Sequence, residues 1–137
     1  MRIVLDSEYY FKNENLVIWQ PKNMLDSYKI KDFITFLDES SKSRDPHFSR
    51  FVDLTKISGL SVNYENLMPV AQTRQKYYVS NFTRKVKMGF FVNNPLAFGM
   101  ARMYQSLNDD KYMETLISES LDEIAKFLKC DKSELEV

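Results

Sequence analysis

The sequence has few of the residues that most often build metal-binding or nucleophilic sites. Its 137 residues include a single cysteine, Cys130, and a single histidine, His47. One cysteine excludes an intramolecular disulfide and a multi-cysteine metal site, and one histidine excludes paired-histidine metal motifs. The three glycines, Gly59, Gly89 and Gly99, are too far apart to form a glycine-rich phosphate loop. We therefore expect neither a metal nor a cofactor.

The chain also lacks a long apolar run and an excess of charge of either sign. No segment approaches the roughly 18 consecutive apolar residues of a membrane helix, and the N-terminal segment lacks the features of a signal peptide. Nineteen basic residues balance nineteen acidic ones, which argues against a dedicated nucleic-acid-binding protein. We expect a soluble cytoplasmic protein with no integral membrane segment and no nucleic-acid partner.

Charge is nevertheless distributed unevenly. Residues 66–108 contain six basic side chains and no acid, whereas residues 109–137 contain nine acids and four bases. The basic segment either forms a docking face for an anion or an acidic partner, or folds back as ordinary surface against the acidic segment. We take the second interpretation as the default.

The length suits one domain, and the N-terminal part predicts a β-hairpin. Alternating residues predict a strand over Ile3–Phe11, and the apolar run Leu16–Trp19 predicts a second one. The polar turn Lys12–Asn15 joins them as an antiparallel pair. Pro21 ends the hairpin, and Asn23 is the expected cap of the first helix.

The rest of the chain alternates strands with helices. Further strands are expected over Phe48–Leu54, Val86–Val92 and Tyr112–Ile117, and helices are expected after Asn23, near Met68, at Pro95 and at Leu121. Such alternation predicts right-handed crossovers and a largely parallel sheet. We predict a single α/β domain over residues 1–137, with a five-stranded mixed sheet, an N-terminal antiparallel hairpin and four helices in the order ββαβαβαβα.

The segment Phe51–Leu60 resembles the strand, loop and helix entry of STAS domains, and more narrowly of the SpoIIAA-like bacterial proteins. The segment Leu96–Tyr104 is similar to the helix that follows an apolar strand in these proteins. The order of elements matches the family over nearly the whole chain. The resemblance implies a STAS-like fold and a regulatory or protein-interaction function, with a protein as the partner. A second copy of the chain is a further candidate partner, because edge strands and aromatic-rich surfaces often pair.

In STAS antagonists, a serine at the start of the helix after this loop is phosphorylated by a partner kinase. The resemblance places that serine at Ser58, with Ser61 as the nearest alternative, and makes Ser58, Gly59 and Ser61 a candidate phosphorylation or anion-binding loop. This sequence departs from the family's Asp-Ser-Ser-Gly, because Lys56 and Ile57 replace the acid and the first serine. The other interpretation is that the serines are turn and cap residues.

The ends of the parallel strands are the expected site of contact, because open α/β sheets bind ligands and partners there. Asp53 and Thr55 follow the third strand, and Asn93 and Asn94 follow the fourth. These four residues are therefore candidates for a partner-binding loop. Arg74 lies on the expected buried stripe of the second helix, and Asp53 is its expected ionic partner.

Binding or carrying an apolar small molecule or lipid is the alternative function. The family also resembles the lipid-carrying CRAL-TRIO fold, and Met88, Phe90, Met100 and Met103 are candidates for an apolar pocket between sheet and helices. The other interpretation of these residues is an ordinary core.

Catalysis is the least supported class of function. His47 lies in a predicted loop with no nucleophile motif nearby, and Cys130 lies at the end of the last predicted helix. We predict that the protein is not an enzyme.

Overall fold

The computed structural model describes residues 8–62, 64–107 and 111–136. The main sheet consists of β1 (Tyr9–Asn13), β2 (Leu16–Trp19), β4 (Ser49–Asp53), β6 (Val86–Phe91) and β7 (Met113–Ser118), in the order β1-β2-β4-β6-β7. β1 and β2 are antiparallel, and the other neighbours are parallel. The predicted five-stranded mixed sheet with an antiparallel hairpin is confirmed.

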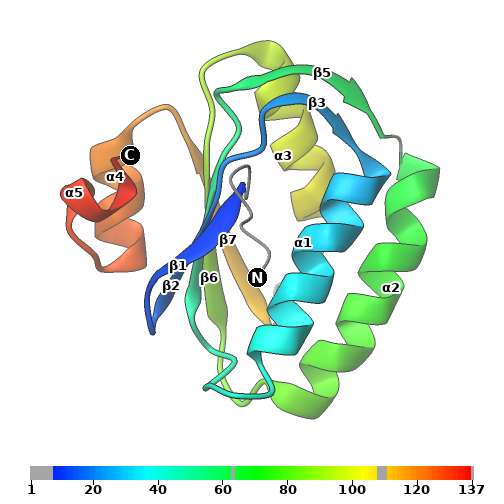
Figure 1. The fold of residues 1–137 in the computed structure, drawn as a ribbon, viewed down its shortest axis with the longest axis vertical. Helices are drawn as coiled ribbons and strands as arrows, with labels where there is room; N and C mark the ends of the chain where they lie inside the picture. The colour runs from blue at the N-terminus through cyan, green and yellow to red at the C-terminus, as the bar shows by residue number, and fades with distance from the viewer. Residues whose placement is uncertain (1–7, 63, 108–110, 137) are drawn as a thin grey trace, which may run out of the picture.

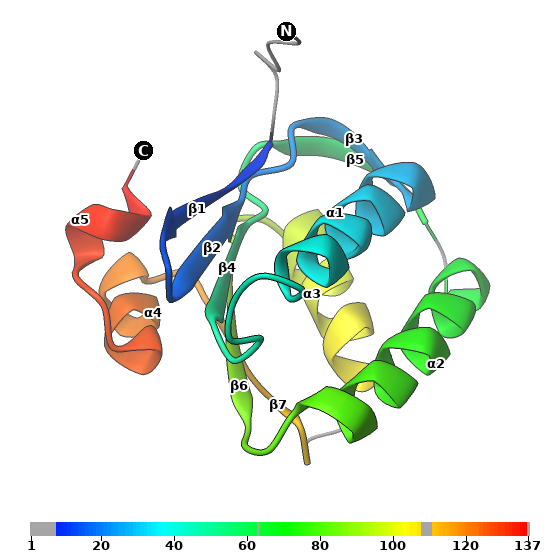
Figure 2. The ribbon, with the colours of Figure 1, turned by 60° about the horizontal axis from the view of Figure 1, so that its bottom comes forward.

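Helices cover both faces of this sheet. They are α1 (Ser27–Ser40), α2 (Tyr64–Asn81), α3 (Pro95–Leu107), α4 (Leu121–Leu128) and α5 (Lys132–Leu135). The first three lie on one face, and α4 and α5 lie on the other (Figures 1 and 2). Each face has its own core, because successive strand residues such as Phe51 and Val52 point to opposite sides. Within the described residues, no helix is long and apolar enough to cross a membrane.

The N-terminal hairpin has a shorter turn than predicted. Of the expected strand, residues 3–7 lie outside the described residues; β1 begins at Tyr9 and continues to Asn13, with an irregular register between Phe11 and Asn13. The Asn13 side-chain oxygen accepts a hydrogen bond from the backbone N–H of Asn15 at 2.8 Å. This Asx-type bond closes the turn within two residues.

Asn23 does not cap the first helix. It begins a further strand, β3 (Asn23–Asp26), with a φ of 62°, a left-handed conformation that asparagine tolerates. Helix α1 begins at Ser27, and its cap is Asp26, whose carboxylate accepts the Lys29 N–H at 3.0 Å.

β3 pairs in parallel with β5 (Ile57–Ser61), and the two form a second, two-stranded sheet that we call the ribbon. The sequence predicted a loop over this segment, and that prediction is wrong. The strand depends on a distant partner: Leu25 lies opposite Leu60, and Asn23 N–H donates to the Lys56 carbonyl at 3.1 Å. The ribbon runs from the main sheet toward the first turns of α1 and α2 (Figure 1).

Helix α2 begins at Tyr64, four residues before the predicted start at Met68. Pro69 therefore lies inside the helix, where it lacks the N–H that would bond to the carbonyl of Glu65. The Thr73 hydroxyl donates to the Pro69 carbonyl at 3.0 Å.

The predicted helix starts at Pro95 and Leu121 are confirmed, and a side chain caps each of them. The Asn94 side-chain oxygen accepts the Ala97 N–H at 2.9 Å, and the Ser120 hydroxyl accepts the Glu123 N–H at 3.2 Å. The short helix α5, capped by Asp131, was not predicted, so the described residues contain five helices rather than four.

Candidate functional site at the carboxyl end of the sheet

The parallel strands β2, β4, β6 and β7 end at the same end of the molecule, the upper end in Figure 1. The structure brings the four predicted partner-binding residues to this end: Asp53, Thr55, Asn93 and Asn94. The ribbon, which carries the candidate serines, crosses the same end. The loops expected to meet a partner are thus gathered on one side.

Asp53 holds the turn that follows β4. Its Oδ1 accepts hydrogen bonds from the backbone N–H and the hydroxyl of Thr55, at 2.9 and 2.6 Å, and its Oδ2 accepts one from Gln20 Nε2 at 3.5 Å. The residue is 6% exposed. A carboxylate this buried and this fully bonded stabilises its own loop.

Arg74 does not pair with Asp53 as predicted. Its buried guanidinium contacts the carboxylate of Asp38 on α1 and donates a hydrogen bond to the Tyr78 hydroxyl. Burial lowers the pKa of Arg74, but the neighbouring Tyr78, Tyr104 and Asp38 outweigh it, and the pKa is raised. The prediction was wrong because a helix on the same face of the sheet supplies a nearer acid.

A second arginine, Arg50 of β4, is fully buried, although nothing in the sequence pattern predicts its burial. Its Nη atoms donate to the carbonyls of Phe48 and Pro46, and its guanidinium lies 4.3 Å from the centre of the Phe48 ring. Burial lowers the pKa of Arg50 to about 10. Arg74 thus links α2 to α1, and Arg50 holds the segment that precedes β4.

The Asn94 side chain forms hydrogen bonds within the start of α3. Besides capping α3, its amide nitrogen donates to the side-chain oxygen of Asn93 at 2.8 Å. Asn93 is exposed, so of these two residues it is the one that faces solvent at the start of α3.

Ser58, Gly59 and Ser61 lie in β5 and not in a loop at a helix N-terminus. Ser58 and Ser61 are exposed, and α2 begins only at Tyr64. The premise that a helix N-terminus would hold a phosphate here is therefore wrong. Phosphorylation of Ser58 itself stays a prediction.

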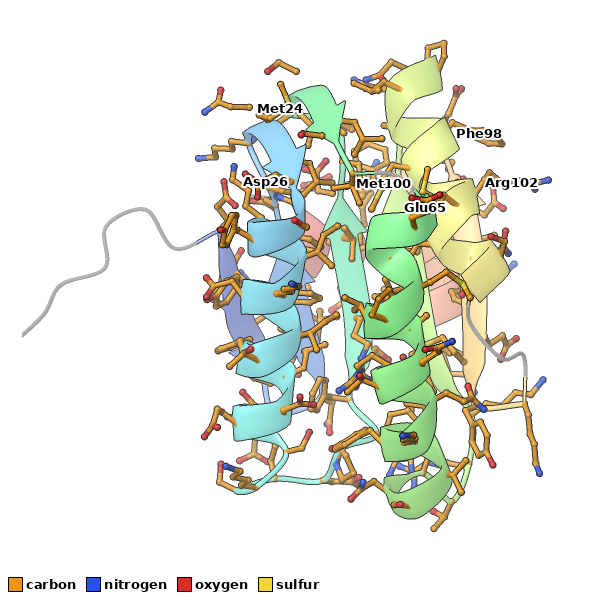
Figure 3. The ribbon with its side chains drawn as sticks, turned by 90° about the vertical axis from the view of Figure 1, so that its right-hand side faces the viewer. Met24, Asp26, Glu65, Phe98, Met100 and Arg102 are labelled. Carbon is orange, nitrogen blue, oxygen red and sulfur yellow. The ribbon has the colours of Figure 1, made fainter. Side chains whose placement is uncertain are left out.

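Three large apolar side chains are exposed at this end: Met24 of β3 at 48%, Leu96 of α3 at 38% and Phe98 of α3 at 45%. Met24 lies across β5 at Gly59, where a Cβ atom would come within 2.7 Å of the methionine Cε. β5 in turn packs against α3. We call these three side chains together the carboxyl-end apolar surface. Leu96 and Phe98 are two residues apart and therefore lie on opposite sides of α3. Figure 3 shows Met24 over the ribbon and Phe98 on the side of α3 away from it, with Arg102 beside Phe98.

An amphipathic pattern for α3 that places Leu96 in its buried stripe does not predict this surface. The buried residues are instead Ala97, Met100 and Ala101. Successive helix residues differ by about 100° in direction, so the two apolar neighbours of a buried Ala97 point away from the core. The position of Leu96 and Phe98 next to Ala97 in the sequence was therefore the signal that could have predicted their exposure.

The predicted apolar pocket is a cavity of about 10 Å³ between the sheet and the helices. Met88, Phe90 and Met100 line it, whereas Met103 packs at the edge of the core and does not. This volume holds about one water molecule, and pockets for small organic ligands measure roughly 300–1,000 Å³. The present cavity is therefore too small for a lipid.

His47 and Cys130 are both in structural environments. His47 Nδ1 lies 2.6 Å from an Asp45 carboxylate oxygen, and Nε2 accepts the Thr83 N–H at 3.0 Å. Burial raises the pKa of the Cys130 thiol, and two nearby acids raise it further. Among the described residues, no three His, Cys, Asp or Glu side chains are placed to hold a metal ion.

No protein-family model matches the sequence, and no curated protein matches it. Among solved structures, the fold is similar to that of an uncharacterised protein from Shewanella loihica PV-4, of the DUF3478 family with a SpoIIAA-like fold. The TM-score is 0.54 at 13% sequence identity, and the match covers 82% of this chain and 83% of the other. The SpoIIAA-like fold expected from the resemblance is thereby confirmed.

Proposed function

We propose that this chain is a non-catalytic regulatory module that binds a protein partner through the carboxyl-end apolar surface. The observation that carries the proposal is the exposure of Met24, Leu96 and Phe98 on adjoining elements at the end of an open α/β sheet where partners usually bind. The SpoIIAA-like fold supports an interaction role by analogy only, since folds host many functions.

The surroundings of this surface suit a protein partner. The Arg102 guanidinium lies 5.7 Å from the centre of the Phe98 ring, so an aromatic anchor and a cation are presented together. Aromatic and arginine side chains contribute most to binding at protein interfaces. The exposed Asn93 adds a polar group at the rim.

Two observations support the non-catalytic part of the proposal. Both ring nitrogens of His47 are engaged within the protein, by Asp45 and Thr83. The raised pKa of Cys130 keeps its thiol protonated and weakly nucleophilic at neutral pH. The sequence has one cysteine and so cannot form an intramolecular disulfide. Because such disulfides are typical of oxidising compartments, we place the protein in the reducing cytoplasm.

Capture of partners on immobilised protein, followed by titration of the purified partner, tests the proposal. Phe98→Ser should weaken binding by about 30-fold, because it removes a central aromatic anchor. Val79→Ser is the matched control: Val79 is 61% exposed but lies near the end of α2, at the opposite end of the molecule. Equal losses in the two variants, or none for Phe98→Ser, would contradict the proposed surface.

A further inference from the structure

The main sheet has two edge strands that differ in their protection against pairing with another strand. β1 has an irregular register between Phe11 and Asn13 and carries Lys12 between them. Irregular register and lysine are two features that protect sheet edges. β7 pairs with β6 in unbroken register, contains neither proline nor lysine, and has Glu114 as its one charge. Within residues 8–62, 64–107 and 111–136, no strand pairs with the outer edge of β7.

The backbone groups of alternate β7 residues point toward this open edge. The N–H groups of Val86 and Val92 donate to the carbonyls of Tyr112 and Ser118, at 2.9 and 3.1 Å. The even-numbered residues of β7 therefore face β6, and the residues between them direct N–H and C=O outward. The outward-facing residues are Met113, Thr115 and Ile117.

We propose that two copies of this chain associate by antiparallel pairing of their β7 strands, around a twofold axis at Thr115. A hydrogen-bonded antiparallel pair joins residues that both direct their backbone groups at the other strand, so odd-numbered residues must meet odd-numbered ones. The axis at Thr115 places Met113 opposite the partner's Ile117 and Lys111 opposite the partner's Glu119.

Charge complementarity selects this axis and a second copy as the occupant. Lys111 and Glu119 are exposed and flank the strand at opposite ends, so the twofold creates two pairs of opposite charges. An axis at Glu114 would place that acid opposite itself, and an axis at Leu116 would place the buried Met113 opposite an acid. The sequence of β7 is thus self-complementary in one register.

The pairing also extends both apolar layers of the molecule. Ile117 lies at the margin of the core under α1, α2 and α3, and Leu116 lies at the margin of the core under α4. Both side chains are partly exposed at the sheet edge. The same strand of a second copy covers both margins at once, as a twofold interface requires.

Sedimentation velocity over a series of concentrations tests the proposal. The wild-type chain should show a monomer–dimer equilibrium. Lys111→Glu alone and Glu119→Lys alone should each weaken the dimer by about tenfold, and the double variant should restore it. Lys126→Glu, the same charge change on an exposed face of α4, is the control and should leave the dimer unchanged.

A second variant tests the backbone pairing. Thr115→Pro removes an N–H that points away from β6, so it should abolish the dimer and leave the far-ultraviolet circular dichroism of the monomer intact. A chain that is monomeric at every concentration overturns the proposal, as does a double charge swap that fails to restore the dimer. A Phe98→Ser variant that still dimerises but no longer binds its protein partner shows that the two surfaces act independently.

Discussion

Arg74 of α2 and Asp38 of α1 form an ion pair that extends from the interior of the protein to its surface. The arginine side chain is 4% exposed and that of the aspartate 42%. The guanidinium also lies 4.5 Å from the centre of the Tyr77 ring. The pair thus links two helices that lie on the same face of the sheet.

Removing the acid of this pair should destabilise the fold. Asp38→Ala leaves the buried Arg74 without a carboxylate, and we expect a loss of about 2 kcal/mol in the free energy of unfolding, less than for a fully buried pair because Asp38 is partly solvated. Urea denaturation measures it. Glu39→Ala, which removes a surface pair with Lys42, should cost less than about 0.5 kcal/mol. Similar losses in both variants would show that the Arg74–Asp38 pair stabilises the fold no more than a surface ion pair does.

Met100 closes the small cavity under the helices. Met100→Ala should lower the free energy of unfolding by about 2–5 kcal/mol, because it removes buried apolar atoms and enlarges an existing void. Met24→Ala, at an exposed methionine, is the matched control and should change it little. Apolar cavities of sufficient size take up benzene or xenon, so uptake by the Met100→Ala variant alone would confirm that the wild-type cavity is too small for ligands.

The Asp45–His47 turn before β4 should make stability depend on acid pH. Hydrogen bonds from the backbone N–H and ring Nδ1 of His47 lower the pKa of Asp45 below its ordinary value of 3.8. A carboxyl group with a lowered pKa stabilises the fold above the unfolded-state pKa, and that stabilisation is lost as the pH falls through the folded-state pKa. Asp45→Asn should therefore melt earlier than wild type near neutral pH, with the difference shrinking in acid. In a His47→Ala background the difference should become smaller but persist, because the backbone N–H of residue 47 still donates to Asp45.

The Cys130 thiol should react slowly. Burial, Glu134 and Asp131 raise its pKa above the ordinary value of 9.0. Since the thiolate is the reactive species, iodoacetamide should alkylate the folded protein more slowly than free cysteine at neutral pH, as followed by mass spectrometry. Glu134→Gln should increase the rate. A wild-type alkylation rate equal to that of free cysteine would contradict the raised pKa and make Cys130 a candidate nucleophile again.

The main sheet was predictable because its signals are local. The apolar run over β6 and the caps Asn94 and Ser120 depend only on residues nearby in the chain. The ribbon was not predictable in this way. Its strands contain Asn23, Ser58 and Gly59, which disfavour strands, and they are held by backbone pairing between segments distant in the chain.

The candidate site was predicted in position but not in detail. The strand order placed Asp53 and Asn94 at the correct end of the sheet, but which of their polar atoms face solvent depends on neighbours in space. Thr55 and Gln20 donate hydrogen bonds to the Asp53 carboxylate, and the Asn94 side chain caps α3. The exposure of Phe98 was within reach of sequence reasoning, since it follows from the helical position of a buried Ala97.

The ribbon connects the starts of α1 and α2. β3 runs directly into α1 at Ser27, and β5 ends three residues before α2 begins at Tyr64. One hydrogen-bonded ladder therefore anchors the first turns of both helices, and the Arg74–Asp38 pair joins them again further along. Met24 lies across both strands of that ladder. Met24 therefore belongs to the segment that fixes where both α1 and α2 begin.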